Sequence, residues 1–188
     1  MSRRGTLCAL ALMVAGLAGC AGQAKDAPYT VQVDPQRYQG TWYELARKPM
    51  FFQRHCAQSE AHYRLRADGA IAVLNRCRSA SGEWQQVTGS ATPQVAGRTD
   101  AFWVRFDNWP TRLFPNLIRG DYRVLYVDPD YQTALVGNRG RDYLWLLSRQ
   151  PTLPEATVRR LLSEANRNGY DTSDLIWRSK DSAIGGGR

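Results

Sequence analysis

The stretch that decides the fold is Gly40-Thr41-Trp42-Tyr43-Glu44, which opens the first run of alternating strand residues in the chain. The last long run of this kind ends at Ser148 and is followed by Arg149. A guanidinium stacks well on an indole face, and the attraction is larger where water is excluded. A tryptophan thus lies at one end of the strand series and an arginine at the other.

Short strands separated by turn signals follow from the apolar and polar alternation between these two ends. We expect them at residues 41–48, 58–66, 70–78, 84–92, 101–107, 120–128, 132–138 and 142–148. Turn signals such as Asp68-Gly69, Ser81-Gly82 and Arg139-Gly140 lie between them. No helical pattern of about 10–15 residues separates the strands, which excludes a βαβ sheet. The prediction is an all-β fold, an eight-stranded antiparallel up-and-down barrel.

One helix is expected after the last strand of the barrel. Thr152-Leu153-Pro154-Glu155 has the spacing of a capping box, and Gly169 is placed to end the helix. Its apolar stripe contains Val158, Leu161, Leu162 and Ala165. A short strand at 175–177 and a disordered tail at 180–188 are expected to complete the chain.

Three segments in order resemble the lipocalin family, in the subgroup of bacterial outer-membrane lipoproteins and apolipoprotein D. They are residues 37–46, 120–131 and 143–149. The resemblance implies that Gly40, Trp42 and Arg149 close one end of the barrel, with the arginine packed across the indole ring. It also implies that the C-terminal helix packs outside the barrel, and that the open end admits an apolar ligand.

Strand alternation also nominates the side chains that face a ligand, because the more apolar face of each strand should point inward. The expected ligand-binding residues are Ala61, Tyr63, Ile71, Val73, Asn75, Phe102, Val104, Phe106, Tyr122, Val124, Tyr126, Tyr143 and Trp145. Tyr143 and Trp145 depend on the register of their strand, because Leu144 and Leu146 would fit a core equally well. These side chains either line a cavity or fill a solid barrel, and the resemblance favours the cavity.

Two apolar loops are expected at the open end of the barrel. They contain Phe51, Phe52, Trp109, Leu113 and Phe114. Such loops insert into a membrane, form a homodimer interface or fold inward as a lid, and membrane contact with lipid exchange is the preferred interpretation. Arg54, Arg112 and Arg119 nearby would suit phosphate or carboxylate head groups.

The first residues have the pattern of an export signal. Residues 1–19 combine a basic start with an apolar stretch that is too short to span a bilayer. Leu17-Ala18-Gly19-Cys20 resembles the lipobox of bacterial lipoproteins, which implies that Cys20 is acylated and becomes the mature N-terminus. The expected organisation is a signal peptide at 1–19, a tether at 20–33 and a barrel domain at 34–179. By family analogy the protein is anchored in the outer membrane and faces the periplasm.

Cys56 and Cys77 remain as a pair in an oxidising compartment, where a disulfide is the first expectation. A simple strand register places Cys77 opposite Ser59, so the bond requires Cys56 to lie in the loop before the strand and fold back. The alternative is a free nucleophilic thiol, for which the sequence offers no convincing base.

Composition and motifs weigh against most other function classes. The chain carries a net charge of +8, but it has no basic block or DNA-binding motif, so we expect no nucleic-acid partner. No catalytic set, metal-ligand spacing or cofactor motif is present, and we expect no enzyme activity, metal or cofactor. The expected function is binding and storage or transport of fatty acids, lysophospholipids or similar amphiphiles in the bacterial envelope. A lipid-modifying enzyme that uses a free cysteine and a protein-interaction module are the alternatives.

Overall fold

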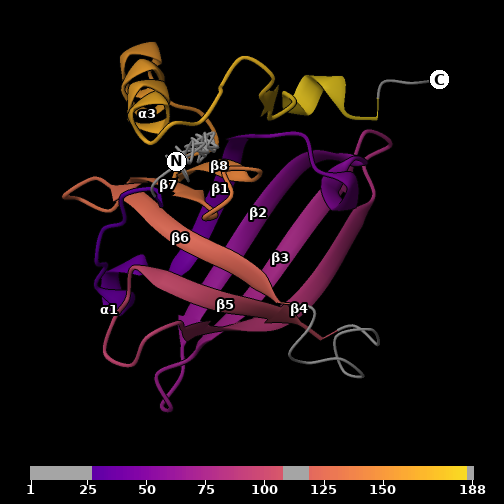
Figure 1. Cartoon of the computed structure of the whole chain (residues 1–188). Helices are drawn as coiled ribbons and strands as arrows, with labels where there is room; N and C mark the ends of the chain where they lie inside the picture. Colours follow the sequence, from indigo (N-terminus) through magenta and orange to yellow (C-terminus); the bar gives the residue numbers. More distant parts are fainter. Residues whose placement is uncertain (1–26, 108–118, 186–188) are drawn as a thin grey trace, which may run out of the picture.

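The computed structural model describes residues 27–107 and 119–185, which form an antiparallel barrel with a helix on its outside (Figure 1). The strands are β1 (Gly40–Arg47), β2 (Cys56–Leu65), β3 (Ile71–Ser79), β4 (Trp84–Pro93), β5 (Ala101–Phe106), β6 (Gly120–Val127), β7 (Thr133–Gly137), β8 (Leu144–Ser148) and β9 (Ile176–Trp177). The helical segments are α1 (Pro35–Tyr38), η1 (Phe51–Gln53), α3 (Glu155–Arg167) and η2 (Asp181–Ala183). All eight expected barrel strands are present, and their ends differ from the prediction by at most two residues.

The sheet closes because β1 pairs with both β2 and β8. From β2 to β8 each strand pairs with the next one in the chain, so the barrel has the predicted up-and-down order. The short β9 pairs with the last two residues of β1, as Ala46 opposite Trp177 and Arg47 opposite Ile176. This topology confirms the expected fold class.

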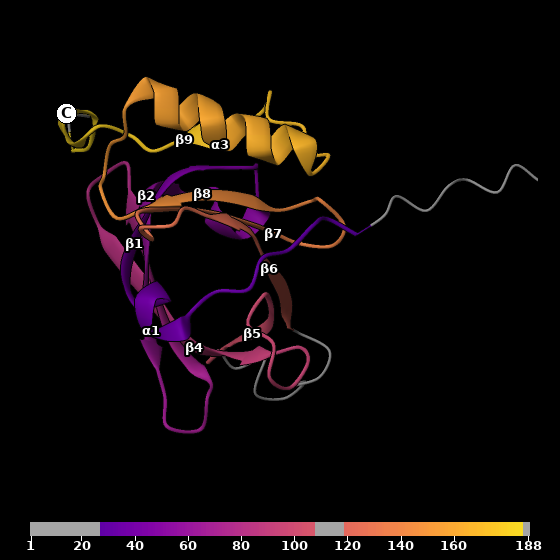
Figure 2. The same cartoon turned by 90° about the vertical axis from the view of Figure 1, so that its left-hand side faces the viewer.

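Helix α3 covers the outside of the barrel beside β7 and β8 (Figure 2). Its buried residues, Leu161 and Ala165, pack against a cluster that includes Leu135, Leu144 and Leu146. Gly169 follows the helix with a φ of +79°, as expected for a helix end. The predicted capping box is wrong, because the helix begins at Glu155 and Pro154 occupies the N-cap position, with no side-chain hydrogen bond.

Two bulges change which side chains face inward. In β1 the register shifts between Glu44 and Ala46, so that Glu44 and Arg47 both face the interior. In β6 the register shifts between Val124 and Tyr126, and Tyr126 pairs with Leu135. Tyr126 therefore packs in the cluster beneath α3, and the expectation that it faces inward is wrong.

The N-terminal segment is docked on the barrel from residue 27. The Val31 N–H donates to the Val124 carbonyl at 2.9 Å, and Val31 and Val33 pack against the interior cluster. The Thr30 hydroxyl donates to Asp100 at 2.7 Å. The expectation of a free tether up to residue 33 therefore differs from the structure at residues 27–33, while residues 20–26 lie outside the described residues.

The C-terminal segment is also held against the barrel. The Gln58 side-chain amide donates to the Ser179 carbonyl at 2.9 Å and to Asp181 at 2.7 Å. The Gly185 N–H donates to the Ala80 carbonyl at 3.0 Å. The predicted disordered tail is thus ordered up to residue 185. No helix within residues 27–107 and 119–185 has the length and apolar character that crossing a bilayer requires.

Candidate functional site

One end of the barrel is closed by Trp42 and Arg149. Trp42 is fully buried, and the guanidinium carbon of Arg149 lies 3.8 Å from the centre of its indole ring. The indole N–H donates to the Tyr38 carbonyl at 2.8 Å, which fixes the ring. Gly40 has a φ of +93°, and an added Cβ would lie 3.3 Å from the Arg149 Nη1 atom. The geometry agrees with the contact that the sequence resemblance implied.

Three tyrosines form a layer above this closure. Tyr122 shares hydrogen bonds with the hydroxyls of Tyr38, at 2.9 Å, and Tyr63, at 3.3 Å. Burial raises the pKa of Tyr63 to about 12 and also raises the pKa of Tyr38 and Tyr122. The tyrosine layer is therefore polar but uncharged at neutral pH. Sequence alternation placed Tyr63 and Tyr122 inward, but it missed Tyr38, which comes from α1 rather than from a strand.

The wall of the barrel is lined by most of the residues that alternation nominated. The interior cluster contains Tyr63, Ile71, Val73, Phe102, Val104, Phe106, Tyr122, Val124 and Trp145. Ala61 is buried directly opposite Trp42 in the β1–β2 register. Leu144 and Leu146 pack beneath α3, so the register of β8 turns Trp145 inward. The structure therefore brings the nominated residues together, with Tyr126 as the exception.

Several inward-facing side chains near the open end are only partly buried. Val104 and Phe106 remain partly exposed although they belong to the interior cluster. Asn75 follows Ile71 and Val73 on the inward face of β3 and is also partly exposed. Its buried Oδ1 atom accepts no hydrogen bond from the described residues. Such an atom favours a donor from water or from a bound molecule.

A buried charged pair lies inside the barrel near the open end. Arg47 donates to Glu44 at 2.9 Å, and their side chains are 3% and 7% exposed. Gln53 from η1 donates to Glu44 at 2.9 Å and accepts from the Trp145 indole N–H at 3.0 Å. Burial raises the pKa of Glu44, and the positive charge of Arg47 opposes that rise. Sequence alternation missed this pair, because residues three apart face opposite ways in a regular strand.

Exposed aromatic side chains stand on the same rim. Phe51 and Phe52 are 75% and 52% exposed and meet edge to face. Phe52 also contacts Tyr143, which contacts Trp145. Tyr143 precedes β8 and so lies at the mouth rather than deep in the barrel. Trp109, Leu113 and Phe114 of the other expected rim loop, together with Arg112, lie outside the described residues.

Cys56 and Cys77 form a disulfide with a Cα–Cα distance of 5.3 Å, as predicted. Cys77 pairs with Ser59, as the simple register required, but Cys56 is the first residue of β2 rather than part of the preceding loop. A register shift between Cys56 and Gln58 brings the two sulfur atoms together. The bond leaves neither sulfur as a free thiol, which removes the nucleophile on which the enzyme alternative relied.

The described residues contain no group of three or more His, Cys, Asp or Glu side chains that could hold a metal ion. His62 contacts the Thr41 hydroxyl at 2.9 Å and Glu60 at 3.1 Å, and His55 accepts from the Arg54 guanidinium at 2.9 Å.

Comparisons with known proteins agree with this architecture. The Lipocalin-like domain family matches residues 33–180. The outer membrane lipoprotein Blc of Escherichia coli K12 is 38% identical over 150 residues, which cover 77% of this chain and 77% of that protein. Apolipoprotein D of Macaca fascicularis is 31% identical over 176 residues, which cover 86% and 88% of the two chains.

Solved structures show the same fold at lower identity. Insecticyanin from the tobacco hornworm Manduca sexta aligns with a TM-score of 0.64 at 16% identity, covering 85% of this chain and 87% of that one. A barrel closed by Trp42 and Arg149, a helix after β8 and the match over residues 33–180 lead to one conclusion. The chain belongs to the lipocalin family.

Proposed function

We propose that this lipocalin binds a small hydrophobic or amphiphilic molecule, a fatty acid or a lysophospholipid, inside its barrel and stores or carries it in the bacterial envelope. The observation that carries this proposal is the difference between the two ends of the barrel. Trp42 and Arg149 close one end, and inward apolar side chains stay partly exposed toward the other end. Burying an acyl chain against that wall would contribute about 25 cal/mol per Å² of apolar surface.

The ligand-contacting residues of this proposal are the inward-facing wall residues. They are Ala61, Tyr63, Ile71, Val73, Asn75, Phe102, Val104, Phe106, Tyr122, Val124 and Trp145, with Tyr143 at the mouth. The apolar tail would point toward the tyrosine layer, and Asn75 would meet a polar group of the ligand through its unpartnered oxygen. Because Glu44 and Arg47 neutralise each other, the inner wall offers no net charge to a head group.

The head group of the ligand would therefore lie at the mouth. Phe51 and Phe52 are 75% and 52% exposed, which supports membrane contact by this rim over a lid. Arg54 and Arg119 lie in the loops that flank β1 and β6 at the same end and would suit an anionic head group. A mouth that touches a lipid surface would let a ligand enter and leave without crossing water.

The proposed location is the outer membrane, with the barrel facing the periplasm and held by acyl chains on Cys20. The name of the Escherichia coli relative, an outer membrane lipoprotein, supports this location. Labelling with radioactive palmitate tests it: the native chain and a Cys8→Ser control should incorporate label, whereas Cys20→Ser should not. Equal labelling of Cys20→Ser would overturn the anchor.

Ligand binding is tested with a fluorescent fatty acid displaced by unlabelled lysophospholipid. Val104→Trp fills the inward face of β5, and Arg105→Trp adds the same side chain to the next, outward-facing position. We expect Val104→Trp to weaken binding at least tenfold and Arg105→Trp to leave it unchanged. Equal affinities of the two variants would place the ligand outside the barrel and contradict the proposal.

A further inference from the structure

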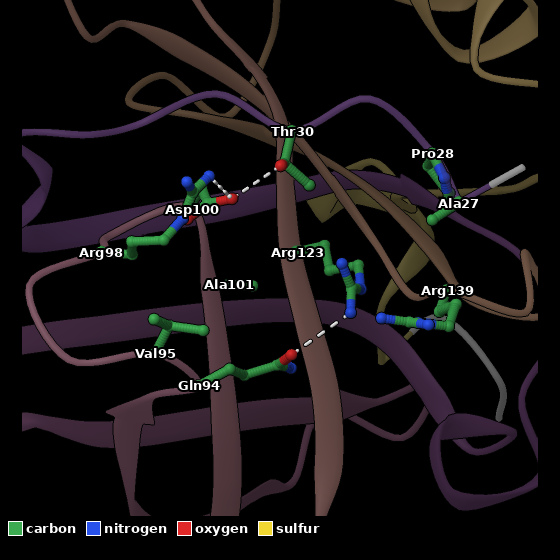
Figure 3. A pocket seen from close by; sticks show the side chains of 10 residues that line it. All are labelled: Ala27, Pro28, Thr30, Gln94, Val95, Arg98, Asp100, Ala101, Arg123 and Arg139. Atoms are coloured by element: carbon green, nitrogen blue, oxygen red, sulfur yellow. Dashed lines mark hydrogen bonds and ion pairs between the residues drawn. The ribbon is translucent and has the colours of Figure 1, made fainter.

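A cavity lies on the outer surface of the barrel, away from the interior described above. It has a volume of about 320 Å³ and is bounded by residues 27–30, the loop between β4 and β5, and Arg123 and Arg139 (Figure 3). Tyr122 and Val124 point into the barrel, so Arg123 between them points out. The cavity and the proposed ligand site are therefore on opposite faces of β6.

The cavity has a strongly basic lining. Arg98, Arg123 and Arg139 line it, whereas Asp100 is the one acidic residue that does. Arg98 is neutralised, because it donates to both carboxylate oxygens of Asp100 at 2.9 and 2.8 Å. Asp100 has no capacity to spare, because it also accepts from Thr30 at 2.7 Å.

The other two arginines of the lining are Arg123 and Arg139. Arg123 is buried, and its Nε atom lies 3.1 and 3.0 Å from the two carboxylate oxygens of Asp121. The same carboxylate accepts from the main-chain N–H of Arg139 at 2.7 Å. None of the described residues forms an ion pair with the Arg139 guanidinium, which points toward that of Arg123 (Figure 3). The Asp121 carboxylate therefore compensates Arg123, and the guanidinium of Arg139 has no acidic partner among the described residues.

We propose that this outer cavity binds the phosphate group of a small phosphate ester, held between Arg123 and Arg139. The Arg139 guanidinium offers the paired N–H donors that a tetrahedral oxyanion accepts. Arg123, whose Nε and Nη2 atoms donate to Asp121 and Gln94, adds its Nη1 atom. An anion would offset the uncompensated charge. The cavity is about ten times the roughly 30 Å³ that one water occupies, so it has room for a phosphate and part of the group that carries it. Glycerol phosphate has a suitable size and chemistry.

The phosphate ester has two sources, a phospholipid head group or a free metabolite. Ala27 and Pro28 form part of the cavity wall, and Ala27 follows the proposed acylation site at Cys20 by only seven positions. An extended segment of that length spans about 23 Å at about 3.3 Å per residue. If the anchor exists, the cavity lies within reach of the membrane surface. Phosphate binding itself does not depend on the anchor.

The proposal is tested by titrating the full chain, carrying Cys20→Ser, with glycerol 3-phosphate and with inorganic phosphate while recording arginine Nε–Hε NMR signals. We expect saturable shifts of the Arg123 and Arg139 signals. Arg139→Gln, an exposed change, should weaken binding at least tenfold, and Arg64→Gln, the same change on β2, should leave it unaltered. Circular dichroism would check that both variants fold.

Vesicles then distinguish the two sources of phosphate. Vesicles of phosphatidylcholine with phosphatidylglycerol are compared with vesicles of pure phosphatidylcholine. If only the vesicles with phosphatidylglycerol displace glycerol 3-phosphate, the site binds an anionic lipid head group. If neither vesicle displaces it, the site takes a free phosphate ester. Absence of any shift at Arg123 and Arg139, or equal affinity of the Arg139→Gln and Arg64→Gln variants, would overturn the proposal.

Discussion

Arg149 ties the end of the barrel to its beginning through Trp42: the guanidinium carbon lies 3.8 Å from the centre of the indole ring. The same guanidinium donates to the carbonyl oxygen of Gln39, just before β1, at 2.7 Å and to that of Thr41, within β1, at 2.7 Å. It also reaches the carbonyls of Arg37 at 2.9 Å and Tyr131 at 3.2 Å. One side chain therefore fastens three segments over the closed end.

Replacing Arg149 by lysine keeps the charge but removes the planar group that stacks and donates in several directions. Loss of the stacking and of most of the four hydrogen bonds should lower the free energy of unfolding by about 2–4 kcal/mol. Urea denaturation measures this change, with Arg64→Lys, an exposed arginine on β2, as the control. Equal stabilities of the two variants would show that the closure contributes nothing beyond charge.

Gly40 should tolerate alanine less well than Gly69 does. Both have a positive φ, +93° and +79°, but an added Cβ at Gly40 meets the Arg149 guanidinium at 3.3 Å and one at Gly69 meets nothing within 4 Å. Backbone strain alone should cost about 1 kcal/mol at Gly69, and Gly40→Ala should cost about 1–2 kcal/mol more. Thermal denaturation compares the stabilities of the two variants. A smaller loss of stability for Gly40→Ala than for Gly69→Ala would contradict the crowding at Gly40.

The disulfide should stabilise the barrel by restricting the unfolded chain. Cys56 and Cys77 are separated by 21 residues, and a loop of that size corresponds to about 3 kcal/mol in the chain-entropy estimate. The Cys56→Ala, Cys77→Ala double variant should lose about that free energy of unfolding, and reductant should destabilise only the native chain. If reductant leaves the free energy of unfolding of the native chain unchanged, the bond does not form.

Much of this fold is predictable because its strands alternate regularly between two environments. Phe102, Val104 and Phe106 could be assigned to the interior, since Arg105 between them cannot be buried without a partner. The disulfide could be expected from two cysteines in a chain whose first residues have the pattern of an export signal, although the register shift that brings Cys56 to Cys77 carries no sequence signal.

Two of the failures come from β-bulges. One extra residue in β6 turns Tyr126 toward α3, where Arg160 lies 5.9 Å from the centre of its ring. The bulge in β1 puts Glu44 and Arg47 on the same inward face, and simple alternation separates them. The docking of residues 27–33 was missed for a different reason, since it depends on side-chain contacts such as that between Thr30 and Asp100.

Acid should loosen that N-terminal attachment. Hydrogen bonds from Arg98 lower the pKa of Asp100 from 3.8 to about 2. Because the folded-state pKa lies below the unfolded value, the stabilisation is complete above about pH 4 and is lost as the pH falls toward 2. The loss should approach about 2 kcal/mol.

Asp100→Asn should lack this part of the acid dependence, whereas Asp130→Asn, at an exposed position, should retain it. Denaturation curves recorded from pH 5 to about pH 2 compare the two variants with the native chain. If the free energy of unfolding falls with pH in the same way for all three proteins, Asp100 does not couple the N-terminal segment to folding.

The central claim is that the barrel carries a lipid, and native mass spectrometry of the chain purified gently from a bacterial host tests it most directly. We predict a protein ion that retains one fatty acid or lysophospholipid, identified after extraction, and a Val104→Trp variant that is empty under the same conditions. A native protein without bound lipid that also fails to take up added fatty acid, or a Val104→Trp variant loaded equally, would contradict the account.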